Sequence, residues 1–243
     1  MRTPLIIAIL ALLALSVFAE EKPDTDWNAH MQRPNMVKNG DFEGDRETSE
    51  HGEYPEHWEA PRAPGVSIQK VGGDHKHVLQ FDVERKVART TGLMYYSKPI
   101  PVEQGQTYDI TMHVKTRGGV TPIIFVKGYA QFDTGKFGKR EREIYRHKKE
   151  VRGQKNEKGE WEFIPTNTWG RFQSYFTPRA PEGAKVRTHR GVETPTVEYV
   201  RIDLYAFGGG EGTVQFDNIR ITRRPAEDST TSQTLKQTDE VRK

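Results

Sequence analysis

The stretch Asn39-Gly40-Asp41-Phe42-Glu43 near the start of the chain has a counterpart near its end, Val214-Gln215-Phe216-Asp217-Asn218-Ile219. Each stretch places an apolar residue beside acidic ones, and we expect both in one domain whose first and last strands lie side by side. The first strand is predicted to run from Met36 to Glu43. Glu43 and Asp217 would then meet, and two carboxylates with nearby backbone carbonyls form the kind of oxygen cage that calcium prefers.

The first 19 residues have the pattern of an export signal. Arg2 supplies the positive charge, residues 5–18 are almost wholly apolar, and cleavage is expected after Ala19. The apolar run is shorter than the roughly 20 residues of a membrane-spanning helix, and acidic residues follow directly. The chain has no cysteine for disulfides or for a lipid anchor. We therefore predict a secreted or periplasmic protein with no stable membrane anchor after cleavage.

The rest of the chain is predicted to hold a single domain. Residues 20–35 are polar and contain two prolines, so we expect a flexible leader. Residues 36–222 carry short apolar runs separated by Gly and Pro, which is typical of a β-rich domain. Residues 223–243 are mostly Ser, Thr, Gln and charged residues, and we predict a disordered tail because they have too little apolar surface to offset the entropy lost on ordering.

Alternation of apolar and polar residues predicts the strands and their buried sides. Residues 107–115 and 197–207 show a clear period of two. Trp58 is expected to be buried beneath the first loop. Without repeats or helix-period segments, the chain is predicted to be all-β, a two-sheet antiparallel β-sandwich. The side chains predicted to point inward are Tyr108, Ile110, Met112 and Val114 in residues 107–115, and Val200, Ile202, Leu204 and Ala206 in residues 197–207.

Residues 136–160 form a basic insertion. This segment holds ten Lys or Arg against five Glu, a net charge of +5, whereas the whole chain carries +3. We interpret it as an extended hairpin or arm. A charged, solvated excursion is one explanation of its composition, and a site for an anionic ligand such as an acidic or sulfated glycan is the other.

A ligand-binding face is predicted on the outward side of the central strands, where aromatic and polar residues share one side. Flat aromatic rings suit the C–H surface of a sugar, and polar groups suit its hydroxyls. The alternative is that the insertion folds over this face and buries the rings. The predicted ligand-binding residues are Asp109, Thr111, His113, Lys115, Phe125, Lys127, Tyr129, Arg201, Asp203, Tyr205 and Phe207.

Four motifs follow one another along residues 36–221. They are Asn39–Glu43 followed by Trp58, Pro101-Val102-Glu103-Gln104-Gly105-Gln106-Thr107-Tyr108, Thr168-Trp169-Gly170-Arg171-Phe172, and Val214–Ile221. In this order they resemble carbohydrate-binding modules of the CenC-like, galactose-binding-like jelly-roll group, and the insertion at 136–160 departs from the pattern of that group. The resemblance implies a jelly roll, carbohydrate binding, and a structural calcium held by Asp41, Glu43 and Asp217.

Other functions have less support in the sequence. The chain has no cysteine nucleophile, Gly-x-Ser-x-Gly, phosphate loop or His-Glu-x-x-His motif, so we do not expect an enzyme. A glycoside hydrolase that pairs Asp109 with Asp203 is one alternative, and an adhesive or structural sandwich that binds a protein is another. Nucleic acid is not an expected partner of an exported protein without a nucleic-acid motif. The leading prediction is a non-catalytic module that binds a carbohydrate, with an acidic polysaccharide favoured by the insertion.

Overall fold

A computed structural model describes residues 25–135, 138–151, 153–155, 161–163, 166–188 and 190–225. The predicted signal at 1–19 and residues 226–243 of the predicted tail lie outside these ranges. The chain divides into an N-terminal unit that ends at Gln32 and a second unit that begins at Arg33.

The described part of the N-terminal unit is helix α1 (Thr25–Gln32), which lies within the leader predicted to be flexible. The residues between Pro23 and Pro34 include neither proline nor glycine, so no local breaker opposes this helix. Across the described residues, none of the helices is both long and apolar enough to cross a membrane.

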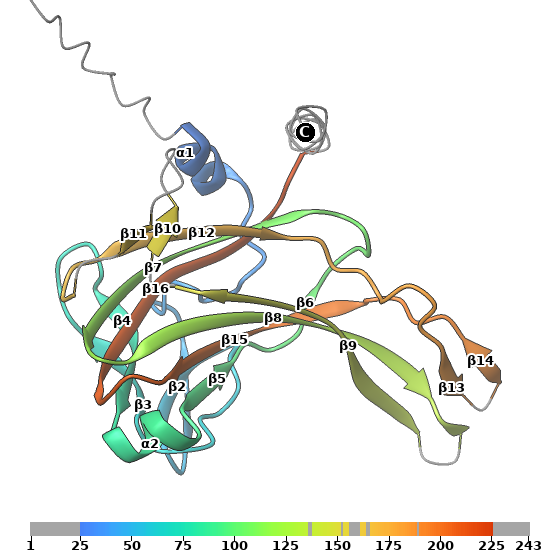
Figure 1. The fold of residues 1–243 in the computed structure, drawn as a ribbon, viewed down its shortest axis with the longest axis horizontal. Coiled ribbons are helices and arrows are strands. Elements are labelled where there is room, and N and C mark those ends of the chain that lie inside the picture. Colours follow the sequence, from blue (N-terminus) through green and yellow to red (C-terminus); the bar gives the residue numbers. More distant parts are fainter. Residues whose placement is uncertain are drawn as a thin grey trace, which may run out of the picture. The chain divides into compact units, whose positions relative to one another are not determined.

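The second unit is a sandwich of two antiparallel sheets, as predicted (Figure 1). Sheet 1 contains, in spatial order, β12 (Gly170–Phe176), β7 (Tyr108–Gly118), β16 (Gly212–Arg223), β4 (His77–Val83) and β3 (Val66–Lys70). Sheet 2 contains β5 (Leu93–Tyr96), β15 (Tyr199–Phe207), β8 (Thr121–Asp133) and β9 (Lys139–Glu150), with β6 (Ile100–Pro101) paired to β15.

Short elements connect these strands. Helix α2 (Arg85–Thr90) follows β4. Three small hairpins are β1 (Arg46–Ser49) with β2 (Gly52–Pro55), β10 (Gly153–Lys155) with β11 (Trp161–Phe163), and β13 (Val186–Thr188) with β14 (Gly191–Glu193).

The core lies between the two sheets and contains the side chains predicted to point inward. Those of β7 and β15 are at most 2% exposed, so both alternation patterns are confirmed. Trp58 is fully buried, as predicted. Its ring stacks on Tyr95 of sheet 2 with centroids 5.5 Å apart, and its Nε1 donates to the carbonyl oxygen of Asn39 at 3.2 Å. The first motif is thereby attached to the core.

The segment predicted as the first strand lies beside β16, but it is not a strand. Asn39 and Phe42 have φ angles of 50° and 57°, and these left-handed conformations interrupt an extended chain. A β-bulge in β16 leaves Ile219 out of register with β7, and its N–H donates to the carbonyl oxygen of Gly40 at 2.8 Å. The two ends of the domain are therefore adjacent, as expected, although the contact is a turn against a bulge.

The described part of the basic insertion is mainly strand β9, which pairs along β8 as an extended hairpin. The register runs from Asp133 opposite Lys139 to Ile123 opposite Glu150. Since β9 joins the edge of sheet 2, it widens the outer face of that sheet (Figure 1). The prediction of an extended hairpin is confirmed for these residues.

Candidate functional site

The predicted ligand-binding residues lie on two different faces of the sandwich. Cross-strand pairing places Phe125 opposite Asp203 and Lys127 opposite Arg201, on the outer face of sheet 2. The four predicted residues of β7 lie on the outer face of sheet 1 instead. The prediction of one shared face is therefore wrong, because alternation shows which side chains point outward but does not show which sheet a strand joins. The residues that the structure brings together are Phe125, Lys127, Tyr129, Arg201, Asp203, Tyr205 and Phe207.

The outer face of sheet 2, called the aromatic face below, carries six aromatic rings. The rings of Tyr129 and Tyr199 stack with centroids 5.5 Å apart, and those of Tyr205 and Phe207 stack at 5.6 Å. Tyr199 is buried and the other five rings are partly exposed. Sequence reasoning missed Tyr96 and Tyr199, although both alternate with buried neighbours. The six rings belong to Tyr96, Phe125, Tyr129, Tyr199, Tyr205 and Phe207.

Cationic side chains lie over several of these rings. The guanidinium of Arg201 is 5.7 Å from the centre of the Tyr129 ring, and that of Arg146 is 6.0 Å from the centre of Phe125. The ammonium of Lys127 is 5.6 Å from the same Phe125 ring. Contacts of this kind hold cations and rings at fixed positions on the face. Arg146 comes from β9, so the basic insertion contributes directly to the aromatic face.

Acidic groups lie between these cations. Asp203 is fully buried and forms an ion pair with Lys127, and its burial raises its pKa even though Lys127 opposes that shift. Its Oδ1 accepts no hydrogen bond from the described residues. Glu59 accepts a hydrogen bond from Arg201 at 2.9 Å, and Glu141 accepts one from the hydroxyl of Tyr199. The aromatic face is therefore a network in which charge is largely balanced.

Two tyrosine hydroxyls of this face, those of Tyr129 and Tyr199, are held in their neutral form. Burial is the main reason that the pKa of Tyr129 is raised to about 12. Burial also raises the pKa of Tyr199 to about 12, with a contribution from its hydrogen bond to Glu141. Both hydroxyls therefore remain hydrogen-bond donors at neutral pH.

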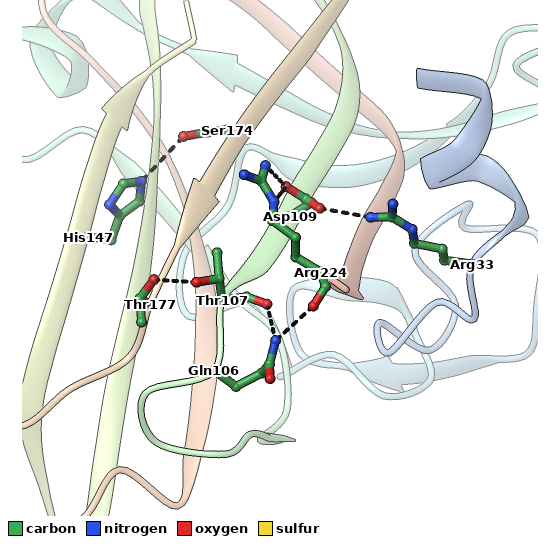
Figure 2. A network of polar contacts seen from close by, with 8 residues as sticks. All are labelled: Arg33, Gln106, Thr107, Asp109, His147, Ser174, Thr177 and Arg224. Atoms are coloured by element: carbon green, nitrogen blue, oxygen red, sulfur yellow. Dashed lines mark hydrogen bonds and ion pairs between the residues drawn. The ribbon is translucent and has the colours of Figure 1, made fainter. Parts of the chain in front are cut away.

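On sheet 1, Asp109 is buried in a structural network (Figure 2). Its carboxylate accepts hydrogen bonds from Arg33 at 3.1 Å and from Nε of Arg224 at 2.9 Å. Figure 2 shows the network continuing from Arg224 to Gln106, whose Nε2 donates to the carbonyl oxygens of Arg224 and Thr107, each at 2.9 Å. Asp109 therefore joins β7 to the segments at both ends of the domain. Because Asp109 and Asp203 lie on opposite outer faces, they cannot flank one glycosidic bond.

The other predicted residues of β7 differ in exposure. Thr111 is only 2% exposed. His113 is partly buried, and burial, followed by the nearby charges of His75 and Arg171, lowers its pKa to about 4. Lys115 is partly exposed and lines a groove of about 300 Å³. Of these four residues, Asp109 and Thr111 are buried, and His113 and Lys115 are partly exposed.

The carboxylates predicted to hold calcium contact histidines. Glu43 accepts a hydrogen bond from the backbone N–H of His77 at 2.7 Å and lies 2.8 Å from Nδ1 of the same residue. Asp217 lies 2.5 Å from Nδ1 of His75. Nowhere in the described ranges do three or more His, Asp or Glu residues form a group that could hold a metal ion. Calcium held by Asp41, Glu43 and Asp217 stays a prediction from the resemblance.

The fold defines the class of this domain as an all-β sandwich of two antiparallel sheets. No protein-family model matches the sequence, and a search of curated proteins finds no match. The solved structures similar to it include the N-terminal cellulose-binding domain of Cellulomonas fimi β-1,4-glucanase C, with 14% identity and a TM-score of 0.38, covering 66% of this chain and 90% of that domain.

Two further similar structures are a module and an enzyme. A family 61 carbohydrate-binding module in complex with β-1,4-galactotriose has 14% identity and a TM-score of 0.40, covering 79% of this chain and 99% of the module. An arabinose-bound α-L-arabinofuranosidase has 12% identity and a TM-score of 0.46, with 77% of this chain matching 26% of the enzyme. Carbohydrate-binding modules are thus among the solved structures to which this chain is similar.

Proposed function

We propose that the protein is an exported, non-catalytic carbohydrate-binding module that holds a glycan on the aromatic face. The observation that carries this proposal is the grouping of six rings from β5, β15 and β8, with charged groups between them. Partly exposed rings offer surface to the C–H groups of a sugar, and the hydroxyls and carboxylates between them suit its hydroxyl groups. Sheet strands hold these side chains rigidly, which limits the entropy lost on binding.

The charge of β9 favours an acidic or sulfated glycan. This strand contains six Lys or Arg against three Glu. Lys148, which lies opposite Phe125 at the edge of the aromatic face, makes no ion pair with any residue in the described ranges. An acidic chain that crosses the face toward β9 would meet this positive charge, and salt would weaken the attraction.

Binding to a glycan array, followed by affinity electrophoresis in the polysaccharides that bind, tests the proposal. Tyr129→Ala and Tyr205→Ala should each weaken binding about tenfold, since each removes a ring with an area for stacking. Tyr175→Ala is the matched control, because Tyr175 is 50% exposed and lies on β12 of sheet 1. If the ligand is an acidic glycan, the affinity of the wild-type protein should also fall as NaCl is raised from about 50 to about 500 mM.

The same experiment distinguishes the other functions. Absence of binding to any glycan, or equal losses in Tyr175→Ala and Tyr129→Ala, would contradict the proposal. Glycosidase turnover with a bound polysaccharide would favour the hydrolase. Binding to a protein alone would favour an adhesive or structural role.

A further inference from the structure

A polar groove lies on the outer face of sheet 1, which is the side of the sandwich away from the aromatic face. It has a volume of about 300 Å³, within the range of small ligand sites. All its lining residues are polar and none is aromatic. They are Gln80 from β4, Lys115, Thr116 and Arg117 from β7, Thr213 and Gln215 from β16, and Asn167 from the loop before β12.

Hydrogen bonds fix the direction of the amides in this groove. Nε2 of Gln80 donates to both carboxylate oxygens of Asp82 at 3.0 Å, because a carboxylate can only accept. The carbonyl oxygen of Gln80 then accepts from Nε2 of Gln215 at 2.7 Å. This chain of bonds leaves the carbonyl oxygen of Gln215 facing away from Gln80, as an acceptor for the hydroxyl of a ligand.

Two cations stand beside these amides. Lys115 lies opposite Gln215 and Arg117 lies opposite Thr213, so both point to the outer face of sheet 1. Neither cation forms an ion pair with any residue of the described ranges. The carboxylate of Asp82 is on β4, at the other side of the groove, where Gln80 and Thr213 donate hydrogen bonds to it. Positive charge therefore lies along β7 and negative charge along β4.

The loop at the end of the groove is also fixed. The backbone N–H of Asn167 donates to the carbonyl oxygen of Thr116 at 2.6 Å. Asn167 has a φ of 64°, a left-handed conformation that asparagine tolerates better than most residues. The backbone of Asn167 is thus held at the groove, and its exposed side-chain amide offers a further donor and acceptor.

We propose that this groove is a second ligand site, which takes a saccharide unit that carries a carboxylate or sulfate group. The acidic group would bind Lys115 and Arg117, and the ring hydroxyls would bind the amides of Gln215 and Asn167. An anion is favoured on the β7 side because Asp82 repels it from the β4 side. The absence of a ring in the groove makes this site depend on charge and hydrogen bonds, whereas the aromatic face depends on stacking.

Calorimetry in a chain that carries Tyr129→Ala and Tyr205→Ala tests this site independently of the aromatic face. The titrants are tetragalacturonate, neutral galactotetraose and sodium sulfate. Adding Lys115→Gln with Arg117→Gln should weaken tetragalacturonate binding tenfold or more. The matched control adds Lys86→Gln with Arg89→Gln, which removes the same charge from exposed positions of helix α2 outside both proposed sites, and should change affinity less than twofold. Melting temperatures verify that every variant is folded.

Three outcomes would overturn the assignment. The first is failure of the Tyr129→Ala, Tyr205→Ala chain to bind tetragalacturonate. The second is an equal loss from the two pairs of Lys and Arg replacements, which would mean general attraction to a basic surface. The third is an affinity for galactotetraose or for sulfate equal to that for tetragalacturonate. Equal affinity for galactotetraose would mean that binding does not require the acidic group, and equal affinity for sulfate would mean that it does not require the sugar. If Tyr129→Ala and Tyr205→Ala do not weaken glycan binding, the role of the aromatic face is contradicted, but the comparison between the two pairs of Lys and Arg replacements still tests the groove.

Discussion

His75 and Asp217, which are 142 positions apart in the sequence, meet with Nδ1 of the imidazole 2.5 Å from a carboxylate oxygen. The ring of His75 also stacks on Trp169 with centroids 4.0 Å apart, and it lies nearly perpendicular to the ring of His113 with centroids 5.1 Å apart. Burial raises the pKa of Asp217 to about 6 in spite of its contact with His75. This cluster therefore joins the loop after β3, the last strand and β7 through groups that titrate.

The stability of the domain should depend on pH through His113. Its pKa is lowered from 6.5 to about 4 mainly by burial, so the unfolded chain takes up a proton at a higher pH than the folded one. The stabilising contribution of neutral His113 is complete above about pH 6.5 and is lost as pH falls through 4. Relative to a His113→Asn variant, the free energy of unfolding should fall by roughly 2 kcal/mol between pH 7 and pH 4, a value reduced from the full shift because solvent screens the partly exposed ring.

Urea denaturation at several pH values measures this difference. Asp217 provides a control of opposite sign. Because its pKa is raised, protonated Asp217 contributes to the free energy of unfolding; this contribution is complete below about pH 4 and is lost as pH rises through 6. Between pH 4 and pH 7, the free energy of unfolding of an Asp217→Asn variant should thus rise more, or fall less, than that of wild type. Parallel pH profiles for wild type and His113→Asn would disprove the assignment to His113.

Gly40→Ala should destabilise the domain by more than about 2 kcal/mol. A Cβ at Gly40 would collide with the carbonyl oxygen of Ile219, and the turn that holds the first motif against β16 would have to move. Gly210→Ala is the control, because its Cβ would find its nearest neighbour at 4.0 Å. Thermal unfolding should show a large loss for the first variant and a change within about 0.5 kcal/mol for the second. Similar values for both would mean that the turn adapts.

Asp109→Asn should lower the free energy of unfolding by about 3 kcal/mol, because it leaves Arg33 and Arg224 partly buried without their shared anion. Glu103→Gln breaks the pair with Arg223, whose side chains are both more than half exposed, and should cost less than about 1 kcal/mol. Chemical denaturation compares the two variants. A loss of glycan affinity in folded Asp109→Asn, with unchanged stability, would instead support the prediction that Asp109 binds the ligand.

Chelation tests the calcium prediction. If Asp41, Glu43 and Asp217 hold calcium, EDTA should lower the melting temperature by several degrees, since a ligand of the folded state stabilises it by mass action. The Asp217→Asn variant should then show no response to EDTA. An unchanged melting temperature of wild type in EDTA would leave Glu43 and Asp217 as partners of His77 and His75 alone.

The sequence predicts which side of each strand is buried better than it predicts the backbone conformation of the segments between strands. Leu204 and Met112 alternate with polar residues, so their burial follows from the period of two alone. The turn at Asn39 and Phe42 was missed because a left-handed residue depends on the local fit against β16. Helix α1 was missed because its short polar sequence carries only a weak helical signal.

The sequence by itself determined that residues 36–222 form a β-sandwich, which side chains fill its core, and that the first motif of this domain lies beside its last strand. These properties follow from local alternation and from motifs that keep their order along the chain. Only the tertiary structure decided which outward residues share a face, because strand pairing joins residues that are far apart in sequence. Asp109 and Asp203 have the same local pattern, yet one binds arginines on sheet 1 and the other faces Lys127 on sheet 2.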